Sequence, residues 1–104
     1  MLKKMKIILL VGMFSTGYSL LCSAAHISRA ELLAVGCFSC HGWEGIGAKR
    51  IPKLSKLTKK DISESLHGFK TGEERSTIMG RHAKAYTDEE ITLLAEYFSN
   101  LKNK

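Results

Sequence analysis

Apolar residues recur every three or four positions in three separate stretches of this chain, which is the spacing of amphipathic helices. The middle stretch ends near Thr71 and Gly72, where a glycine suits the end of a helix. The last stretch continues to about Asn100 or beyond. In the first stretch Leu32, Leu33 and Gly36 lead directly into the cysteines. The apolar stripes of the other two are Ile62, Leu66 and Phe69, and Ile91, Leu94, Ala95, Phe98 and Leu101. This pattern predicts three helices.

Each of these stretches begins with the residues of a helix N-terminal cap. A Ser or Thr is followed three positions later by an acidic residue, so the hydroxyl and the carboxylate can each accept a hydrogen bond from a backbone amide. An apolar residue before the cap and another after the acid complete a hydrophobic staple. The pairs of cap and acid are Ser28 and Glu31, Thr58 and Asp61, and Thr87 and Glu90. The helix starts therefore agree with the apolar stripes.

The segments between the predicted helices, 42–57 and 73–86, are expected to be ordered loops. The first is rich in glycine and contains the only proline, Pro52, and the second contains Gly80. No stretch alternates apolar and polar residues as a strand does, and no repeat or second domain is visible. The sequence therefore predicts a small all-α domain with three main helices.

The chain begins with a segment typical of a secretory signal peptide. Residues 1–6 carry three lysines and no acid, and an apolar stretch follows over 7–21. A membrane anchor is the alternative, but this stretch contains Ser and Thr and is shorter than the roughly 20 apolar residues of a span. Small residues at its end favour cleavage after Ala25. We therefore expect a signal peptide over 1–25 and an exported, periplasmic domain over 26–104 without a stable membrane span.

The leader carries part of the basic charge. The whole chain has a formal net charge of +6, and removal of the three leader lysines lowers it to +3. The remaining Lys and Arg residues do not form a dense stripe interleaved with aromatic residues, so we expect no nucleic-acid partner.

Two of the three cysteines lie in the pentapeptide 37–41, Cys-Phe-Ser-Cys-His. Thiols one helical turn apart can form thioethers with the two vinyl groups of a porphyrin, and the adjacent imidazole then faces the iron. This is the pattern of c-type haem attachment. The third, Cys22, leaves with the leader unless it is the acylated first residue of a lipoprotein, for which Leu21 is too large a neighbour. We expect one covalently bound haem c, attached through Cys37 and Cys40.

Two other kinds of site remain as alternatives for the cysteine pair. A zinc site would need two further ligands from His26, His67 or His82, which lie at no recognisable finger spacing. A redox-active dithiol of thioredoxin type is expected between strands and helices, and this chain has no strand pattern.

The expected iron ligands are His41 on one face of the haem and Met79 on the other. Met79 is the only methionine that remains after removal of the leader, and it lies outside the helical stripes, in the loop 73–86. Its alternative role is to fill space in the core. His67 and His82 are competing ligands, and either would give bis-histidine coordination and a lower potential.

Further residues have expected roles around the haem. Trp43, directly after the haem motif, is expected to pack against the porphyrin edge, and its alternative role is to donate its indole N–H to a haem propionate. Basic residues flank the two loops that border the haem, where they form either a solvated face or a docking surface for an acidic partner. They are Lys49, Arg50, Lys53, Lys56, Arg81 and Lys84.

With a haem motif near the start, a methionine in a late loop and a terminal helix, the chain resembles class I cytochromes c over nearly the whole length after the leader. The resemblance implies an all-helical shell around one haem, with Cys37 and Cys40 as the thioether cysteines. It implies His41 as the proximal ligand and Met79 as the distal one.

The same resemblance gives Pro52 a place beside the haem. It matches a loop proline near the proximal histidine, in a region that commonly supplies a carbonyl to the imidazole N–H. An earlier proline of the family loop is replaced here by the stretch 48–50, Ala-Lys-Arg, so the sequence leaves this hydrogen bond open.

A closer resemblance rests on the segments 69–73, 76–81, 83–91 and 95–98. They are similar to the cytochrome subunit of flavocytochrome c sulfide dehydrogenases, in which a haem domain accepts electrons from a flavoprotein that oxidises sulfide. This implies a flavoprotein sulfide dehydrogenase as the redox partner. Such subunits often have two haem domains, so the single motif here represents at most half of one.

The function expected from these observations is electron transfer by a periplasmic monohaem cytochrome, without a catalytic site of its own. A free carrier that serves a terminal oxidase or another respiratory partner is the alternative within this class. A gas-binding or peroxidatic haem protein is the alternative from another class, and it requires Met79 to be absent from the iron or weakly bound.

Overall fold

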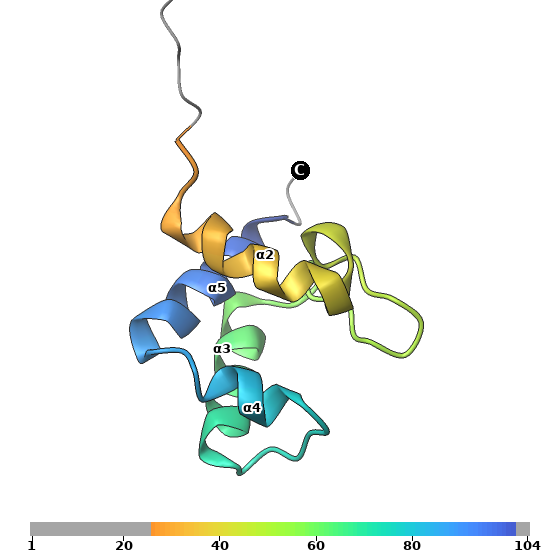
Figure 1. Ribbon diagram of the computed structural model, residues 1–104, viewed down its shortest axis with the longest axis vertical. Helices are drawn as coiled ribbons and strands as arrows, with labels where there is room; N and C mark the ends of the chain where they lie inside the picture. Colours follow the sequence, from red (N-terminus) through yellow and green to blue (C-terminus); the bar gives the residue numbers. More distant parts are fainter. Residues whose placement is uncertain (1–25, 102–104) are drawn as a thin grey trace, which may run out of the picture.

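The computed structural model describes residues 26–101, so the predicted leader lies outside the described residues. Helices account for most of this part of the chain (Figure 1). In chain order they are α2 (Arg29–His41), the short 3-10 helix η1 (Trp43–Gly45), α3 (Lys59–Thr71), α4 (Met79–Ala83) and α5 (Asp88–Asn100). A single isolated bridge, between Ala48 and Ile51, is the only strand-like pairing among the described residues. The prediction of an all-α domain is confirmed.

Capping boxes start the three long helices, as predicted. Ser28, Thr58 and Thr87 each accept a hydrogen bond from the amide three residues on, and the acid at that position bonds back to the amide of the cap. Gly72 ends α3 in the left-handed conformation with φ of 86°, which glycine adopts without steric cost.

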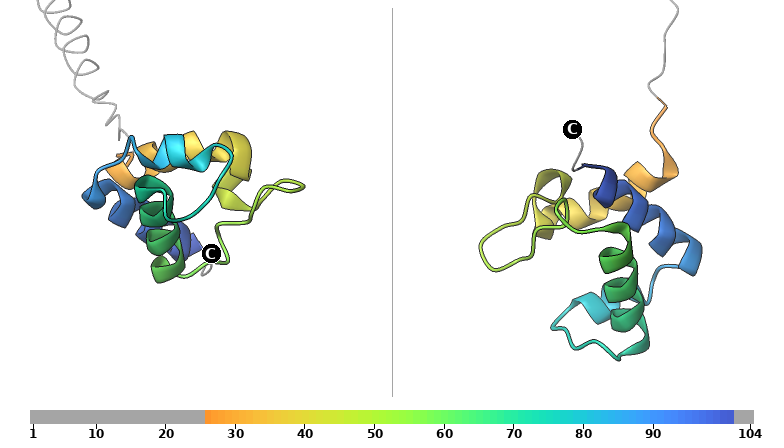
Figure 2. Two further views of the ribbon diagram at one scale, coloured as in Figure 1. Left: turned by 90° about the horizontal axis from the view of Figure 1, so that it is seen from below. Right: turned by 180° about the vertical axis from the view of Figure 1, so that it is seen from behind.

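α5 packs against both α2 and α3, and α4 packs against α3. Figure 1 and the left view of Figure 2 both place α2 and α4 on the same side of α3 and α5. The core lies where these helices meet, and its buried residues are Ala34, Ile62, Leu66, Ala83, Ile91, Leu94, Ala95 and Phe98. The predicted stripes of the middle and last helices are therefore confirmed.

The inner face of the first helix differs from the prediction. Leu33 packs against the core as expected, but Leu32 is 62% exposed. Ala34, Cys37, Phe38 and His41 also face the interior. These four positions are three or four residues apart, so a helix presents them on one side. The predicted stripe was too short to fix which side of α2 faces α5.

The loop expected over 73–86 contains α4, and Met79 is its first residue rather than a loop residue. No side chain caps this helix at Ile78, but the hydroxyl of Ser76 accepts a hydrogen bond from the Gly80 amide at 2.8 Å. Ala83 at its end is fully buried. Packing on α3, together with the Ser76 hydrogen bond, therefore holds this single turn in helical form.

None of the helices between residues 26 and 101 is both long and apolar enough to cross a membrane.

Candidate functional site

The last two turns of α2 bring the cysteine pair and the histidine together. Cys37 is half-buried and Cys40 is exposed, and neither forms a disulfide. They are three positions apart, close to one helical turn, so both thiols are presented within one turn of the same helix.

His41 is held in a fixed orientation. Its residue is 8% exposed, and its Nδ1 lies 2.7 Å from the carbonyl oxygen of Pro52. A carbonyl can only accept, so Nδ1 carries the proton and donates it, which leaves the Nε2 lone pair free for a ligand. The hydrogen bond that the sequence left open is therefore present, despite the Ala-Lys-Arg replacement in the loop.

The path of the loop after α2 explains how Pro52 reaches the imidazole. Gly42 and Gly47 have φ values of 81° and 86°, and the Gly47 amide donates to the His41 carbonyl at 2.6 Å. Farther on, the Leu54 amide donates to the Gly45 carbonyl at 2.8 Å. The loop thus turns back on itself and returns the Pro52 carbonyl to the end of α2.

The Cys37 thiol lies beside the Tyr86 hydroxyl, which precedes the cap of α5. Burial raises the pKa of Cys37, and the interaction with Tyr86 only partly offsets this. Burial also raises the pKa of Tyr86, with a further contribution from Cys37. Both groups are therefore held in their neutral form at neutral pH, in surroundings suited to an apolar ligand. Nothing in the local sequence pairs these residues, because they lie in separate segments that only the fold brings together.

Met79 is half-buried and packs against the same core as Cys37, Phe38 and Leu54. It comes from α4, whereas the cysteines and His41 come from α2, and both helices lie on the same side of α3 and α5 (Figure 1). The side chains predicted for the site thus come from two separate segments on one face of the molecule. The role of Met79 as an iron ligand stays a prediction.

The two histidines that compete with Met79 lie in other surroundings. The Nδ1 of His67 is 3.8 Å from a carboxylate oxygen of Asp88, so this ring faces the start of α5. His82 is exposed on α4. In the described part of the chain no three His, Cys, Asp or Glu residues gather as metal ligands would, so the zinc alternative has no support there.

Trp43 is 71% exposed, and its ring centroid lies 5.2 Å from that of Phe38, the second residue of the cysteine motif. Phe38 also packs edge-on against Phe98 of α5, at 6.2 Å. The rings of Phe38, Trp43 and Phe98 thus form an aromatic cluster at the end of α2. The sequence did not predict this cluster, because its three residues come from three separate elements.

The chain is similar in sequence to one protein family and to several characterised proteins. The model of the family described as cytochrome c matches residues 29–102. The cytochrome subunit of sulfide dehydrogenase from Chlorobaculum tepidum is 48% identical over 77 residues, which cover 74% of this chain and 70% of that protein. The expectation that the chain corresponds to at most half of such a subunit is therefore wrong for this relative.

More distant relatives include two other kinds of protein. A cytochrome c-553 from Helicobacter pylori is 34% identical over 76 residues, which cover 69% of this chain and 77% of that protein. A thiosulfate dehydrogenase electron acceptor from Thiomonas intermedia is 34% identical over 71 residues, or 66% of this chain, but only 33% of that protein is covered.

Proposed function

The chain belongs to the cytochrome c family of electron-transfer proteins, whose members bind haem c covalently, and on this premise we propose how its own residues hold the haem. Cys37 and Cys40 provide the two thioethers, His41 the proximal ligand and Met79 the distal ligand. Trp43 and Pro52 border the haem.

The observation that carries this proposal is the hydrogen bond from His41 Nδ1 to the Pro52 carbonyl. It fixes the tautomer and the orientation of the ring, and it leaves Nε2 as the nitrogen free to act as a ligand. Two free thiols within one turn of the same helix fit the covalent attachment. The residues present therefore fit a haem of the c type.

The bound haem supplies a one-electron couple, and the protein residues determine how it is used. Met79 would contribute a neutral sulfur, which favours the reduced state and raises the potential. With His41 opposite, no coordination position would remain for a substrate. The chain is therefore an electron carrier and not an enzyme.

For the redox partner we propose a flavoprotein sulfide dehydrogenase. The support is the relative at 48% identity, which is named the cytochrome subunit of a sulfide dehydrogenase. The second candidate is a free carrier for a respiratory partner, and it is favoured by the relatives named cytochrome c-553. Both candidates operate in the periplasm, for which the support is the leader-like segment 1–25.

Affinity purification of the tagged holoprotein from its native periplasm distinguishes these candidates. Haem and flavin are measured in the purified material, and its reduction by sulfide is followed in the haem spectrum. We expect about one flavin for each haem, and reduction by sulfide only when the flavoprotein is present. A holoprotein that purifies without flavin, or that sulfide reduces equally fast in isolation, contradicts the subunit proposal and leaves the free carrier.

A further inference from the structure

The loop 42–57, which connects α2 to α3, has a buried side and an exposed side. Gly45 lies on the buried side, and its carbonyl accepts a hydrogen bond from the Leu54 amide at 2.8 Å. Trp43, Ile46 and Ile51 are 71%, 59% and 38% exposed. Figure 1 shows that the loop projects away from the helices. Large apolar side chains exposed so close together along the chain are typical of an interaction site.

Backbone hydrogen bonds hold the projecting part of the loop in shape. Ala48 and Ile51 exchange two of them, at 3.2 and 2.8 Å, so Lys49 and Arg50 form a tight two-residue turn. Lys49 has a φ of 51°, a conformation that favours glycine or asparagine over lysine. A partner would therefore meet side chains on a backbone that is already ordered, and binding would cost little conformational freedom.

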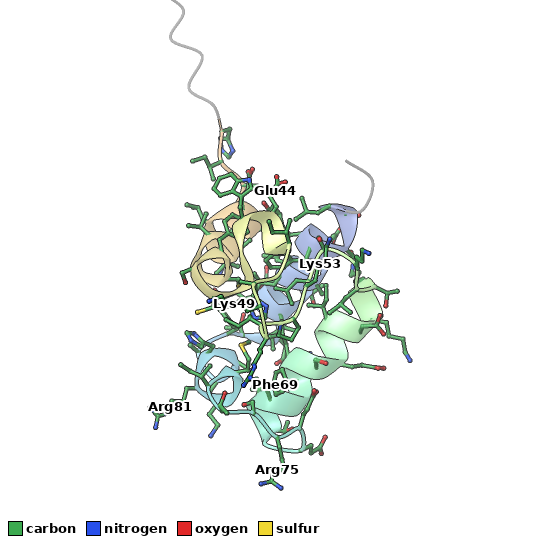
Figure 3. The ribbon with its side chains drawn as sticks, turned by 90° about the vertical axis from the view of Figure 1, so that its right-hand side faces the viewer. Glu44, Lys49, Lys53, Phe69, Arg75 and Arg81 are labelled. Carbon is green, nitrogen blue, oxygen red and sulfur yellow. The ribbon has the colours of Figure 1, made fainter. Side chains whose placement is uncertain are left out.

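The loop is also positively charged. It contains four cations and one acid, Glu44. All four cations are exposed, and none forms an ion pair with another residue of 26–101. Figure 3 views the molecule from the side on which the loop projects, with Lys49 near the middle and Lys53 above it. The charge of the loop therefore fits an acidic partner. The four cations are Lys49, Arg50, Lys53 and Lys56.

The same loop is joined to the proposed haem site. The Pro52 carbonyl lies 2.7 Å from Nδ1 of His41, and the ring centroid of Trp43 lies 5.2 Å from that of Phe38 in the cysteine motif. A protein bound to the loop would lie next to the proposed proximal ligand. Because electrons pass only between redox groups that are close together, this position favours a redox partner.

We propose that the loop 42–57 is the docking site for the partner flavoprotein. The inference rests on the proposed function and adds to it the surface that the partner contacts. The matching surface would have an apolar hollow for Ile46 and Ile51. Carboxylates around this hollow would face Lys49, Arg50 and Lys53. Arg50 can bind one carboxylate through two parallel hydrogen bonds, which a lysine cannot do.

Two variants of the loop each remove one of these features. Ile46→Gln replaces an exposed apolar side chain by a polar one. Lys49→Asn with Arg50→Gln removes the two charges of the turn, and asparagine tolerates the positive φ at position 49. None of these residues is proposed to hold the haem, so the haem spectrum should equal that of the wild type in both variants.

Each variant has a matched control elsewhere on the surface. Leu32→Gln makes the same kind of apolar-to-polar change at a 62% exposed position of α2. Arg75→Gln with Lys84→Gln removes two exposed charges that have no ion pair within 26–101, but from the segment 73–87.

Affinity purification of the tagged holoproteins from the native periplasm, with flavin and haem measured, tests the proposal. The ratio of flavin to haem should fall about fivefold or more in each loop variant and clearly less in each control. A wild-type ratio in either loop variant, or an equal loss in its control, overturns the docking site. A wild type that purifies without flavin contradicts the proposed partner itself, and the docking proposal falls with it.

A membrane is the other surface that a cationic loop with exposed apolar residues could bind. The holoprotein is therefore sedimented at physiological salt with vesicles of equal parts phosphatidylglycerol and phosphatidylcholine. We expect little of the wild type to sediment, and no change in Ile46→Gln. Sedimentation of most of the wild type that is lost in both loop variants would assign the loop to the membrane and contradict the docking of the flavoprotein.

Discussion

At the scale of single residues, Gly45 shows how closely the loop after the haem motif is packed. It is buried with φ of 72°, and a Cβ at this position would lie 2.9 Å from Cδ1 of Phe98 and 3.0 Å from Cβ of Leu54. The same loop carries the Pro52 carbonyl to His41. Close packing of this glycine on α5 therefore supports the orientation of the proximal histidine.

Gly45→Ala should for this reason destabilise the protein more than Gly72→Ala. Both positions have positive φ, which costs about 1–2 kcal/mol for alanine, but a Cβ at Gly72 has no atom within 4 Å. The clash at Gly45 should add about 1–3 kcal/mol. Urea denaturation of the two variants measures the difference. Equal losses would show that the loop yields and that its packing on Phe98 does not matter.

Single residues also show what the sequence could not predict about the site. The spacing of Cys37, Cys40 and His41 follows from one helical turn and is local. The contact of Cys37 with Tyr86 and the hydrogen bond of His41 to Pro52 depend on the path of the chain between helices. That path is set by glycine conformations and backbone bonds, which a pattern of residue types does not encode.

At the scale of elements, the three long helices owe their starts to local chemistry. Thr87 accepts from the Glu90 amide at 3.2 Å, and the Glu90 carboxylate accepts from the Thr87 amide at 2.9 Å. These bonds satisfy two amides that α5 would otherwise leave without a partner. Signals of this kind act within four residues, which is why the sequence predicted these starts correctly.

Thr87→Ala should therefore lower the free energy of unfolding by about 1 kcal/mol, the usual cost of losing such a cap. Thr92→Ala is the control, since Thr92 is exposed within the same helix and its hydroxyl bonds only to the Asp88 carbonyl. Its change should stay within about 0.5 kcal/mol. Thermal unfolding measures both, and a loss for Thr87→Ala no larger than the control would contradict the capping role.

The start of α5 should also depend on pH. The Thr87 amide, followed by the Arg29 guanidinium, holds the pKa of the Glu90 carboxyl below its ordinary value of 4.5. A depressed pKa means that ionised Glu90 stabilises the fold above that value and that this contribution is lost as the pH falls through the folded pKa.

Comparison with Glu90→Gln tests this dependence, since Gln can keep the capping box but carries no charge. The wild type should be the more stable protein at pH 7, and the difference should close between about pH 5 and pH 3. Urea denaturation at a series of pH values gives the two curves. A difference that stays constant from pH 7 to pH 3 would contradict a role for the charge.

The short helix α4 shows the limit of local prediction at this scale. It has no side-chain cap at Ile78 and contains Gly80, and five residues are too few to form a stable helix alone. Ala83, which is fully buried, and the Ser76 hydroxyl hold it in place. The pattern of residues does not indicate this helix, because most of its stability comes from packing on α3.

At the scale of the whole molecule, the cations of residues 26–101 that have no ion pair all lie in the segments 46–57 and 73–87, which border the proposed haem site. They are Lys49, Arg50, Lys53, Lys56, Arg75, Arg81 and Lys84. Clustered charge of one sign attracts a partner of the opposite sign and raises the association rate. Cations on the long helices are instead bound to acids, as in the pairs Lys59–Glu96 and Lys60–Glu64. We therefore expect an acidic surface on the redox partner opposite these segments.

Matched lysine substitutions test this arrangement. Lys49→Gln with Lys53→Gln should lower the rate of association with the redox partner several-fold and weaken its dependence on salt. Lys60→Gln with Lys59→Gln removes the same charge from paired positions of α3 and should have a smaller effect. Stopped-flow mixing at several salt concentrations measures both. Equal effects of the two pairs would show that net charge alone matters.

The proposed haem site also belongs to the scale of the whole molecule, since α2 would supply His41 and α4 would supply Met79 as the two iron ligands. The most direct measurement is the spectrum of the oxidised holoprotein with Met79→Ala as the variant and His67→Ala and His82→Ala as controls. The account predicts a sulfur-to-iron band in the wild type and in both histidine variants. It predicts loss of this band, with rapid carbon monoxide binding by the reduced protein, only in Met79→Ala. A wild type without the band, or a band that survives in Met79→Ala, would contradict it.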